Sequence, residues 1–289
     1  MNYRNQRFRR IIERPHLRAH WENTFYGYEV QQDRMKGPQV LDYLKSTLEL
    51  IAYTQYLYSQ CFALRFDLRF PRDAWSPAWV ERNEALQAFL DHLSSELEQA
   101  SGKHSRKLHY LWARELNDQS RRLYPDRAHC VDREADLTRP HYHLLIILNR
   151  DSFNALGHIF PTRHGPWAGN YADQCLAHRI QRAWSWALDN RPHERMPGMV
   201  EFAKDLNGSP ISFTFRRQQG PAGLKEVMYV ASYLCKAYSK NFAASRCFQR
   251  SYANQDFCKD FWETLGPDPH DLGRLLTWWW LPDRTEPLF

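Results

Sequence analysis

The sequence has no apolar run that approaches about 18 residues, the length that a membrane-spanning helix needs. Residues 1–20, MNYRNQRFRRIIERPHLRAH, carry basic side chains but no apolar segment behind them, so they do not resemble a secretory signal. We therefore expect a soluble protein that is not exported, that stays in the cytoplasm and that has no membrane partner.

Regular cysteine spacing is also missing. The six cysteines form no C-x-x-C pair, which argues against a disulfide framework and against a zinc knuckle, so we expect reduced thiols. No G-x-x-x-x-G-K-[ST] motif occurs, which excludes a P-loop helicase domain. The formal charge of +6, the pI near 9.0 and an aromatic content of 15% fit a nucleic-acid surface, and they fit an ordinary basic enzyme equally well.

Periodicity along the chain predicts an α+β fold. The segment 61–71, CFALRFDLRFP, alternates apolar and charged residues as a half-buried strand does, and the apolar run within 139–150 indicates a central strand. Further strands are expected at 107–117, 199–204 and 211–217, and helices at 39–60, 76–100, 172–189 and 224–241. This order predicts an antiparallel sheet with helices largely on one side.

Two histidines stand one residue apart at the start of the expected central strand, in RPHYHLLIILNR. Residues i and i+2 of a strand share a face, so His141 and His143 can bind one metal ion, or they can form a structural pair with carbonyls or water. If strand 107–117 is an antiparallel neighbour, Glu115 supplies a third ligand, and Asp67 is the competing choice. Such a set suits Mg²⁺ or Mn²⁺, and imidazole ligands favour Mn²⁺.

The expected helix 224–241 offers a nucleophile. Tyr229, Tyr233 and Lys236 follow helical spacing and would share one face, where a lysine stabilises a phenolate and the charge that develops at phosphorus. The alternative is that these tyrosines are ordinary packing residues on a helix surface.

The H-hydrophobic-H strand, the upstream acidic residue and the downstream Y-x-x-x-Y-x-x-K helix together resemble the HUH endonuclease superfamily of rolling-circle replication initiators. Longer stretches, RFDLRFP, YLWARELN, RPHYHLLIILNRD and YVASYLCK, look like the inovirus (filamentous phage) replication initiators and their prophage homologues. The resemblance covers roughly residues 60–250. It implies a ferredoxin-like, RNA-recognition-motif-like sheet, His141 and His143 as metal ligands with Glu115 as the third, Tyr233 as the principal nucleophile and Tyr229 as a second one.

The resemblance also implies a function. The protein would nick single-stranded origin DNA or an extruded hairpin, form a 5′-phosphotyrosine bond, and later rejoin the ends, in the cytoplasm of a bacterial host. A host helicase and the host replication machinery would be partners. Arg65, Arg69 and Arg72 are candidates for contacts to the DNA backbone. Two alternatives remain: a non-catalytic DNA- or RNA-binding regulator on the same fold, and a single-strand transposase or plasmid relaxase.

We expect three parts in the chain. Residues 1–58 form a basic amino-terminal arm and a helix, residues 59–250 form the HUH endonuclease domain, and residues 251–289 form a tryptophan-rich extension. In that extension, Trp278–Trp280 either dock on the domain or form a contact surface, and docking is favoured because large exposed apolar patches are rare.

Overall fold

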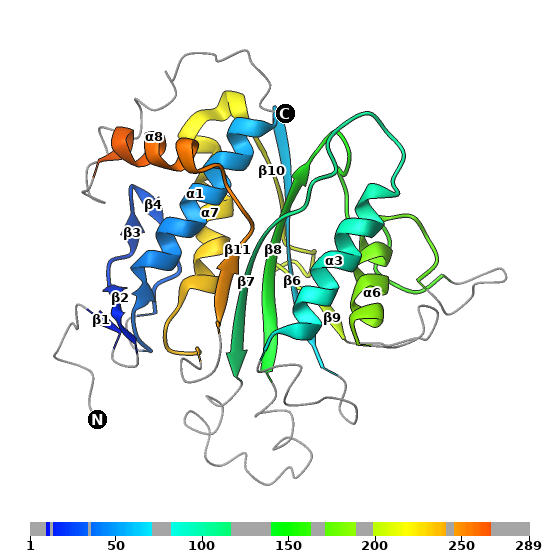
Figure 1. Cartoon of the computed structure of the whole chain (residues 1–289), viewed down its shortest axis with the longest axis horizontal. Coiled ribbons are helices and arrows are strands. Elements are labelled where there is room, and N and C mark those ends of the chain that lie inside the picture. The colour runs from blue at the N-terminus through cyan, green and yellow to red at the C-terminus, as the bar shows by residue number, and fades with distance from the viewer. Residues whose placement is uncertain are drawn as a thin grey trace, which may run out of the picture.

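A computed structural model describes eight segments of the chain, namely residues 10–11, 14–33, 36–70, 82–116, 140–162, 171–188, 199–240 and 246–266. In these segments the protein is an α+β fold built on a six-stranded antiparallel sheet, with five α-helices (Figure 1). None of the described helices has the length and apolar character to cross a membrane. The expected Trp278–Trp280 cluster lies outside the described residues.

The central sheet is formed by six strands that lie between residues 60 and 250. Its members are β6 (Gln60–Arg69), β7 (His109–Leu116), β8 (Pro140–Asn149), β9 (Val200–Phe202), β10 (Ser212–Arg216) and β11 (Phe248–Arg250). They lie in the order β10-β6-β8-β7-β11, and β9 pairs with β6 beyond the end of β10. The expected antiparallel pairing of β7 with β8 is confirmed, and it sets Glu115 opposite His141. The β6–β8 ladder sets Asp67 opposite His143.

Helices cover both faces of this sheet. They are α1 (Leu41–Leu57), α3 (Glu84–Glu98), α6 (Leu176–Ala187), α7 (Lys225–Ser232) and α8 (Gln255–Leu265). Figure 1 shows α3 and α6 side by side on one side of the sheet, with α1, α7 and α8 on the other. The prediction of helices largely on one side was wrong, because every residue of β8 is buried and a strand that is apolar on both faces needs cover on both.

One part of the fold has a compact and regular arrangement. Along the chain, β6, α3, β7, β8, α6 and β9 follow the order β-α-β-β-α-β. In space the four strands lie in the order β9-β6-β8-β7, and α3 and α6 pack on the same face. The opposite face, under α1 and α7, is left for polar residues at one end of β6, β7 and β8.

The described part of the expected amino-terminal arm is folded against the core. It contains β1 (Arg10–Ile11), β2 (Arg14–His20), β3 (Thr24–Phe25), β4 (Tyr28–Glu29) and β5 (Gln39–Val40). Phe25 and Tyr26 are fully buried with residues of α1 and α8. The Gln31 N–H donates to Ser232 Oγ at 2.8 Å, and the Ala237 N–H donates to Pro38 O at 3.0 Å. This segment therefore holds the end of α7 in place.

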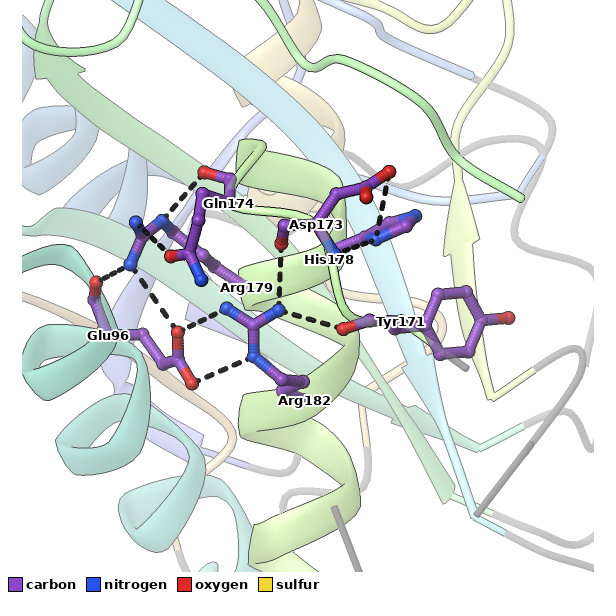
Figure 2. Close-up of polar contacts among 7 residues, drawn as sticks. All are labelled: Glu96, Tyr171, Asp173, Gln174, His178, Arg179 and Arg182. Atoms are coloured by element: carbon purple, nitrogen blue, oxygen red, sulfur yellow. Dashed lines mark hydrogen bonds and ion pairs between the residues drawn. The ribbon is translucent and has the colours of Figure 1, made fainter. Parts of the chain in front are cut away.

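A buried ion-pair network joins α3 to α6, on the face of the sheet opposite to α1 and α7 (Figure 2). Arg182 binds the Glu96 carboxylate through two nitrogens: Nε lies 3.0 Å from Oε1, and Nη2 lies 2.6 Å from Oε2. Arg179 lies 3.5 Å from Glu96 Oε2 and also donates to the Glu96 carbonyl. Both guanidinium groups are nearly buried, so Glu96 is their shared counter-charge.

Replacing Glu96 with alanine is expected to destabilise the fold by about 3 kcal/mol or more, because it leaves two buried guanidinium groups without a counter-charge. Urea denaturation of the variant measures the loss. Glu98→Ala, which removes an exposed carboxylate from the same helix, is the matched control and should stay within about 0.5 kcal/mol of the wild type. Equal stability of the two variants would contradict a structural role for this network.

A buried histidine makes stability depend on pH. His109 lies under α1, its Nε2 is 3.0 Å from the Tyr58 hydroxyl, and burial, with the charge of Lys107, lowers the pKa of His109 from 6.5 to about 4. Between these two values the unfolded chain binds a proton that the folded chain excludes. Stability should therefore fall as the pH drops from 6.5 to 4, by up to about 3 kcal/mol for this group.

The measurement is the free energy of unfolding at several pH values for the wild type and for His109→Gln. The variant should lose part of the slope in that window, since glutamine does not titrate. Identical slopes for both proteins would show that His109 is not held neutral by the fold.

Candidate active site

Four polar side chains project from neighbouring strands onto the face that α7 covers. Asp67 lies on β6, His141 and His143 on β8, and Glu115 on β7, and all four residues are buried. The alternation of side chains along a strand puts both histidines on one face, and the ladder register brings Asp67 and Glu115 to either side of them. The sequence-predicted residues of three separate strands therefore meet at one point.

The donor atoms converge as the ligands of a cation do. His141 Nε2 lies 3.1 Å from His143 Nε2, and His143 Nε2 lies 3.2 Å from Glu115 Oε2. Adjacent ligands of a cation with bonds near 2.1 Å stand about 3 Å apart, so these spacings suit a metal. Potential ligand atoms of all three residues lie within 4.8 Å of one another. Among the described residues, no other group of histidine, cysteine and carboxylate side chains converges in this way. Two imidazoles and a carboxylate are a chemically suitable set for Mn²⁺ or Mg²⁺.

Asp67 contacts the other side of the histidine pair. The Nδ1 atom of His143 lies 2.6 Å from Asp67 Oδ1. Burial raises the pKa of the Asp67 carboxyl, but the hydrogen bond and charge of His143 outweigh it and leave the pKa below its usual value. A carboxylate that accepts the Nδ1–H of a histidine leaves the Nε2 lone pair free for a metal. The structure thus brings Glu115, rather than Asp67, to the side on which the two Nε2 atoms meet.

Glu115 is held by two buried lysines. Lys236 Nζ lies 2.9 Å from Oε2, and Lys240 Nζ lies 3.1 Å from Oε1. Burial raises the pKa of Glu115, and the charges of Lys240, His143 and Lys236 together hold it well below the usual value. Lys240 was missed in the sequence, although its spacing of four residues from Lys236 in CKAYSK is a signal that could have been followed.

The chain bends sharply between α7 and these lysines. The predicted helix 224–241 was wrong beyond Ser232, because a short 3₁₀ turn, Tyr233–Cys235, follows α7 and Lys236 is extended, with ψ at 138°. Lys236 forms a β-bridge with Gln39, so a tertiary backbone contact replaces the next helical turn. This bend directs Lys236 toward Glu115.

Tyr233 lies beside the histidine pair. Its ring centroid is 5.1 Å from that of His143 in an edge-to-face arrangement, the Arg65 guanidinium carbon is 4.1 Å from the Tyr233 centroid, and Lys236 Nζ is 3.4 Å from it. Burial and the charge of Glu115 raise the pKa of the Tyr233 phenol, whereas Arg65 lowers it by its charge and a hydrogen bond. Two cations therefore flank the ring whose oxygen would carry negative charge after deprotonation.

The other predicted residues differ in how they relate to this cluster. Tyr229 is 44% exposed, and no hydrogen bond, ion pair or ring contact joins its side chain to the cluster within the described segments. Arg69 pairs with Glu201 at 2.6 Å on the surface of the sheet. Arg65 contacts Tyr233, and Arg72 lies outside the described residues.

Fold and site together define a class, an α+β protein with a buried histidine–carboxylate group beside a cation-flanked tyrosine. The pattern of the family described as "YagK/YfjJ C-terminal domain" matches residues 21–125 and 131–251, and the chain belongs to this family. The matched segments contain Glu115, the two histidines, Tyr233 and both lysines. No curated protein and no solved structure matches the chain significantly.

Proposed function

We propose that this protein is a metal-dependent, strand-transferring DNA endonuclease of the HUH type, acting as a rolling-circle replication initiator of a phage or prophage. One observation carries the proposal: His141, His143 and Glu115 converge on a common point, and Tyr233 lies against His143 with Lys236 over its ring. This is the arrangement that metal-assisted attack of a phenolate on a phosphodiester needs.

The arrangement of strands supports the same proposal. The order β9-β6-β8-β7, with α3 and α6 on one face, supports a ferredoxin-like βαββαβ unit. In this proposal that unit is the HUH core, β8 carries the histidine pair, and the turn that follows α7 brings the nucleophile Tyr233 from the opposite face. A fold alone does not define a function, and the residues of the site carry the chemistry.

His141, His143 and Glu115 would hold the cation, which as a Lewis acid polarises a phosphodiester oxygen. The Tyr233 oxygen attacks the phosphorus, a bond from oxygen to phosphorus forms, and the bond between phosphorus and the 3′ oxygen breaks. The phenol proton passes to solvent and the 3′ oxygen takes up a proton, so the products are a 5′-phosphotyrosine and a 3′-hydroxyl. Attack of that hydroxyl on the ester reverses the step and rejoins the strand.

The cations beside Tyr233 have two tasks in this reaction. Lys236 and Arg65 would stabilise the phenolate, which the raised pKa of Tyr233 makes costly to form, and they would also neutralise charge on the phosphoryl oxygens. Tyr229 is exposed and one helical turn before Tyr233, where it would serve as the second nucleophile in resolving the circle.

The substrate in this proposal is single-stranded DNA from an origin, or from an extruded hairpin. A duplex would have to be opened by a host helicase, and synthesis from the new 3′-hydroxyl would need the host replication machinery. The formal charge of +6 is compatible with a polyanionic substrate, although it fits an ordinary basic enzyme equally well.

The test incubates the protein with labelled single-stranded oligonucleotides from its own genomic neighbourhood, with Mn²⁺ or with EDTA, followed by a denaturing protein gel. A shifted, labelled band that requires Mn²⁺ and disappears in His141→Ala and His143→Ala is the expected result. His104→Ala, which changes an exposed histidine, is the matched control and should keep the band. DNA binding without any adduct on any strand would favour a non-catalytic binding protein instead.

A further inference from the structure

We propose that Lys240, together with Lys236, makes the binding of the divalent cation conditional on the binding of the DNA phosphodiester, so that the two bind cooperatively. The inference rests on the proposed function, since it concerns the same site. It assigns a role to Lys240, which lies outside the tyrosine–lysine motif and touches neither Tyr233 nor the histidines in the described contacts.

Without any ligand, the site has an excess of positive charge. Three cationic side chains, from Lys236, Lys240 and Arg65, lie in or beside the cluster, and two carboxylates, from Glu115 and Asp67, oppose them. These five side chains alone leave one positive charge in excess. A divalent cation would raise this excess to three positive charges in a site where burial strengthens every charge–charge interaction.

Each lysine contacts one oxygen of the Glu115 carboxylate. Oε2 of Glu115, the oxygen that faces His143 Nε2 at 3.2 Å, already accepts from Lys236 at 2.9 Å, so an incoming cation has to share that oxygen with an ammonium group. Lys240 occupies Oε1 and its side chain is fully buried, so solvent does not screen its charge. Both lysines therefore weaken the site for a cation that arrives alone.

A phosphodiester reverses this balance. Each phosphate brings one negative charge, and it would lie between the cation and the side chains of Lys236 and Arg65, the two cations nearest Tyr233. Because linkage is reciprocal, DNA must tighten the binding of the cation by the same factor by which the cation tightens the binding of DNA. The phosphate therefore lowers the excess positive charge of the site and makes the binding of the cation more favourable.

The experiment uses full-length Tyr233→Phe protein, which cannot form the ester, and titrates Mn²⁺ by calorimetry with and without a bound single-stranded oligonucleotide. The Mn²⁺ dissociation constant should fall by at least about tenfold when the oligonucleotide is present. The same titration on a variant that also carries His141→Ala corrects for Mn²⁺ held by the DNA itself. Equal dissociation constants, or no Mn²⁺ binding at this site even with DNA, would overturn the inference.

Lys240→Met and Lys240→Arg test the residue itself in the same background. Removing the charge should tighten Mn²⁺ binding in the absence of DNA and reduce the factor by which DNA changes it, whereas arginine should retain both wild-type values. Weaker Mn²⁺ binding by Lys240→Met would contradict the inference and indicate that Lys240 only orients Glu115. If Lys240→Met does not fold, the comparison with and without DNA in the Tyr233→Phe protein still decides. These titrations need no cleavage, so they test the inference separately from the proposed function. A missing covalent adduct in the gel assay would contradict the proposed function instead.

Discussion

Tyr233→Phe is expected to lower the rates of covalent DNA linkage and of strand cleavage by about three orders of magnitude or more, because the variant lacks the attacking oxygen. The ring itself should stay in place. Its contacts with His143 and Lys236 and the stacking of Arg65 involve the ring, which phenylalanine keeps, and only the hydrogen bond between Arg65 and the phenol oxygen is lost. The measurement is the rate of adduct formation with Mn²⁺ on the preferred oligonucleotide, together with the free energy of unfolding, which should change by less than about 1 kcal/mol.

Tyr229→Phe is the matched control for this prediction, since it removes the same atom one helical turn away. Its side chain is exposed and makes no described contact with the cluster, so the first cleavage should continue, while release or rejoining of the second end should slow. Wild-type adduct formation by Tyr233→Phe, with loss in Tyr229→Phe, would exchange the roles of the two tyrosines.

Glu115→Ala is expected to have the largest effect on stability of any change in the site. The carboxylate is the shared partner of two buried lysines, at 2.9 Å and 3.1 Å, and its loss leaves both ammonium groups without a counter-charge. Breaking a buried ion pair by removing one partner costs about 3–5 kcal/mol. Urea denaturation in EDTA measures this loss, and cleavage should vanish as well because one metal ligand is gone.

Two further variants decide whether this loss comes from unpaired charge. Adding Lys240→Met to Glu115→Ala should recover part of the stability, because one of the two orphaned charges is then removed. Glu201→Ala breaks an exposed pair with Arg69 and should cost less than about 1 kcal/mol. A Glu115→Ala protein as stable as Glu201→Ala would contradict the buried ion-pair geometry.

Local patterns in the sequence were sufficient to predict much of the candidate site. The period of two along a strand placed His141 and His143 on one face, and antiparallel pairing of consecutive strands placed Glu115 beside them. The same reasoning left Asp67 as an alternative ligand, and its position opposite His143 could be known only from the register of β6 against β8. Register between strands that are far apart in sequence is a tertiary property.

Long-range contacts explain what the sequence could not reveal. Residues 224–241 contain no proline or glycine, so helical propensity extends past Ser232, yet the β-bridge between Gln39 and Lys236 ends the helix. Lys240 reaches Glu115 only because of that bend. The apolar run of β8 indicated a central strand, but it does not determine which helices cover each face of the sheet.

The most direct test of the central claim is to find the atom that carries the DNA. Trypsin cleavage after Lys225 and Lys236 releases the peptide EVMYVASYLCK, which contains both Tyr229 and Tyr233. After reaction with Mn²⁺ and nuclease trimming, fragment-ion mass spectrometry of this peptide should place a nucleotide phosphate on Tyr233. A nucleotide on a residue outside this peptide, or an unmodified peptide in a protein that has cleaved its strand, would contradict a phosphotyrosine mechanism at this site.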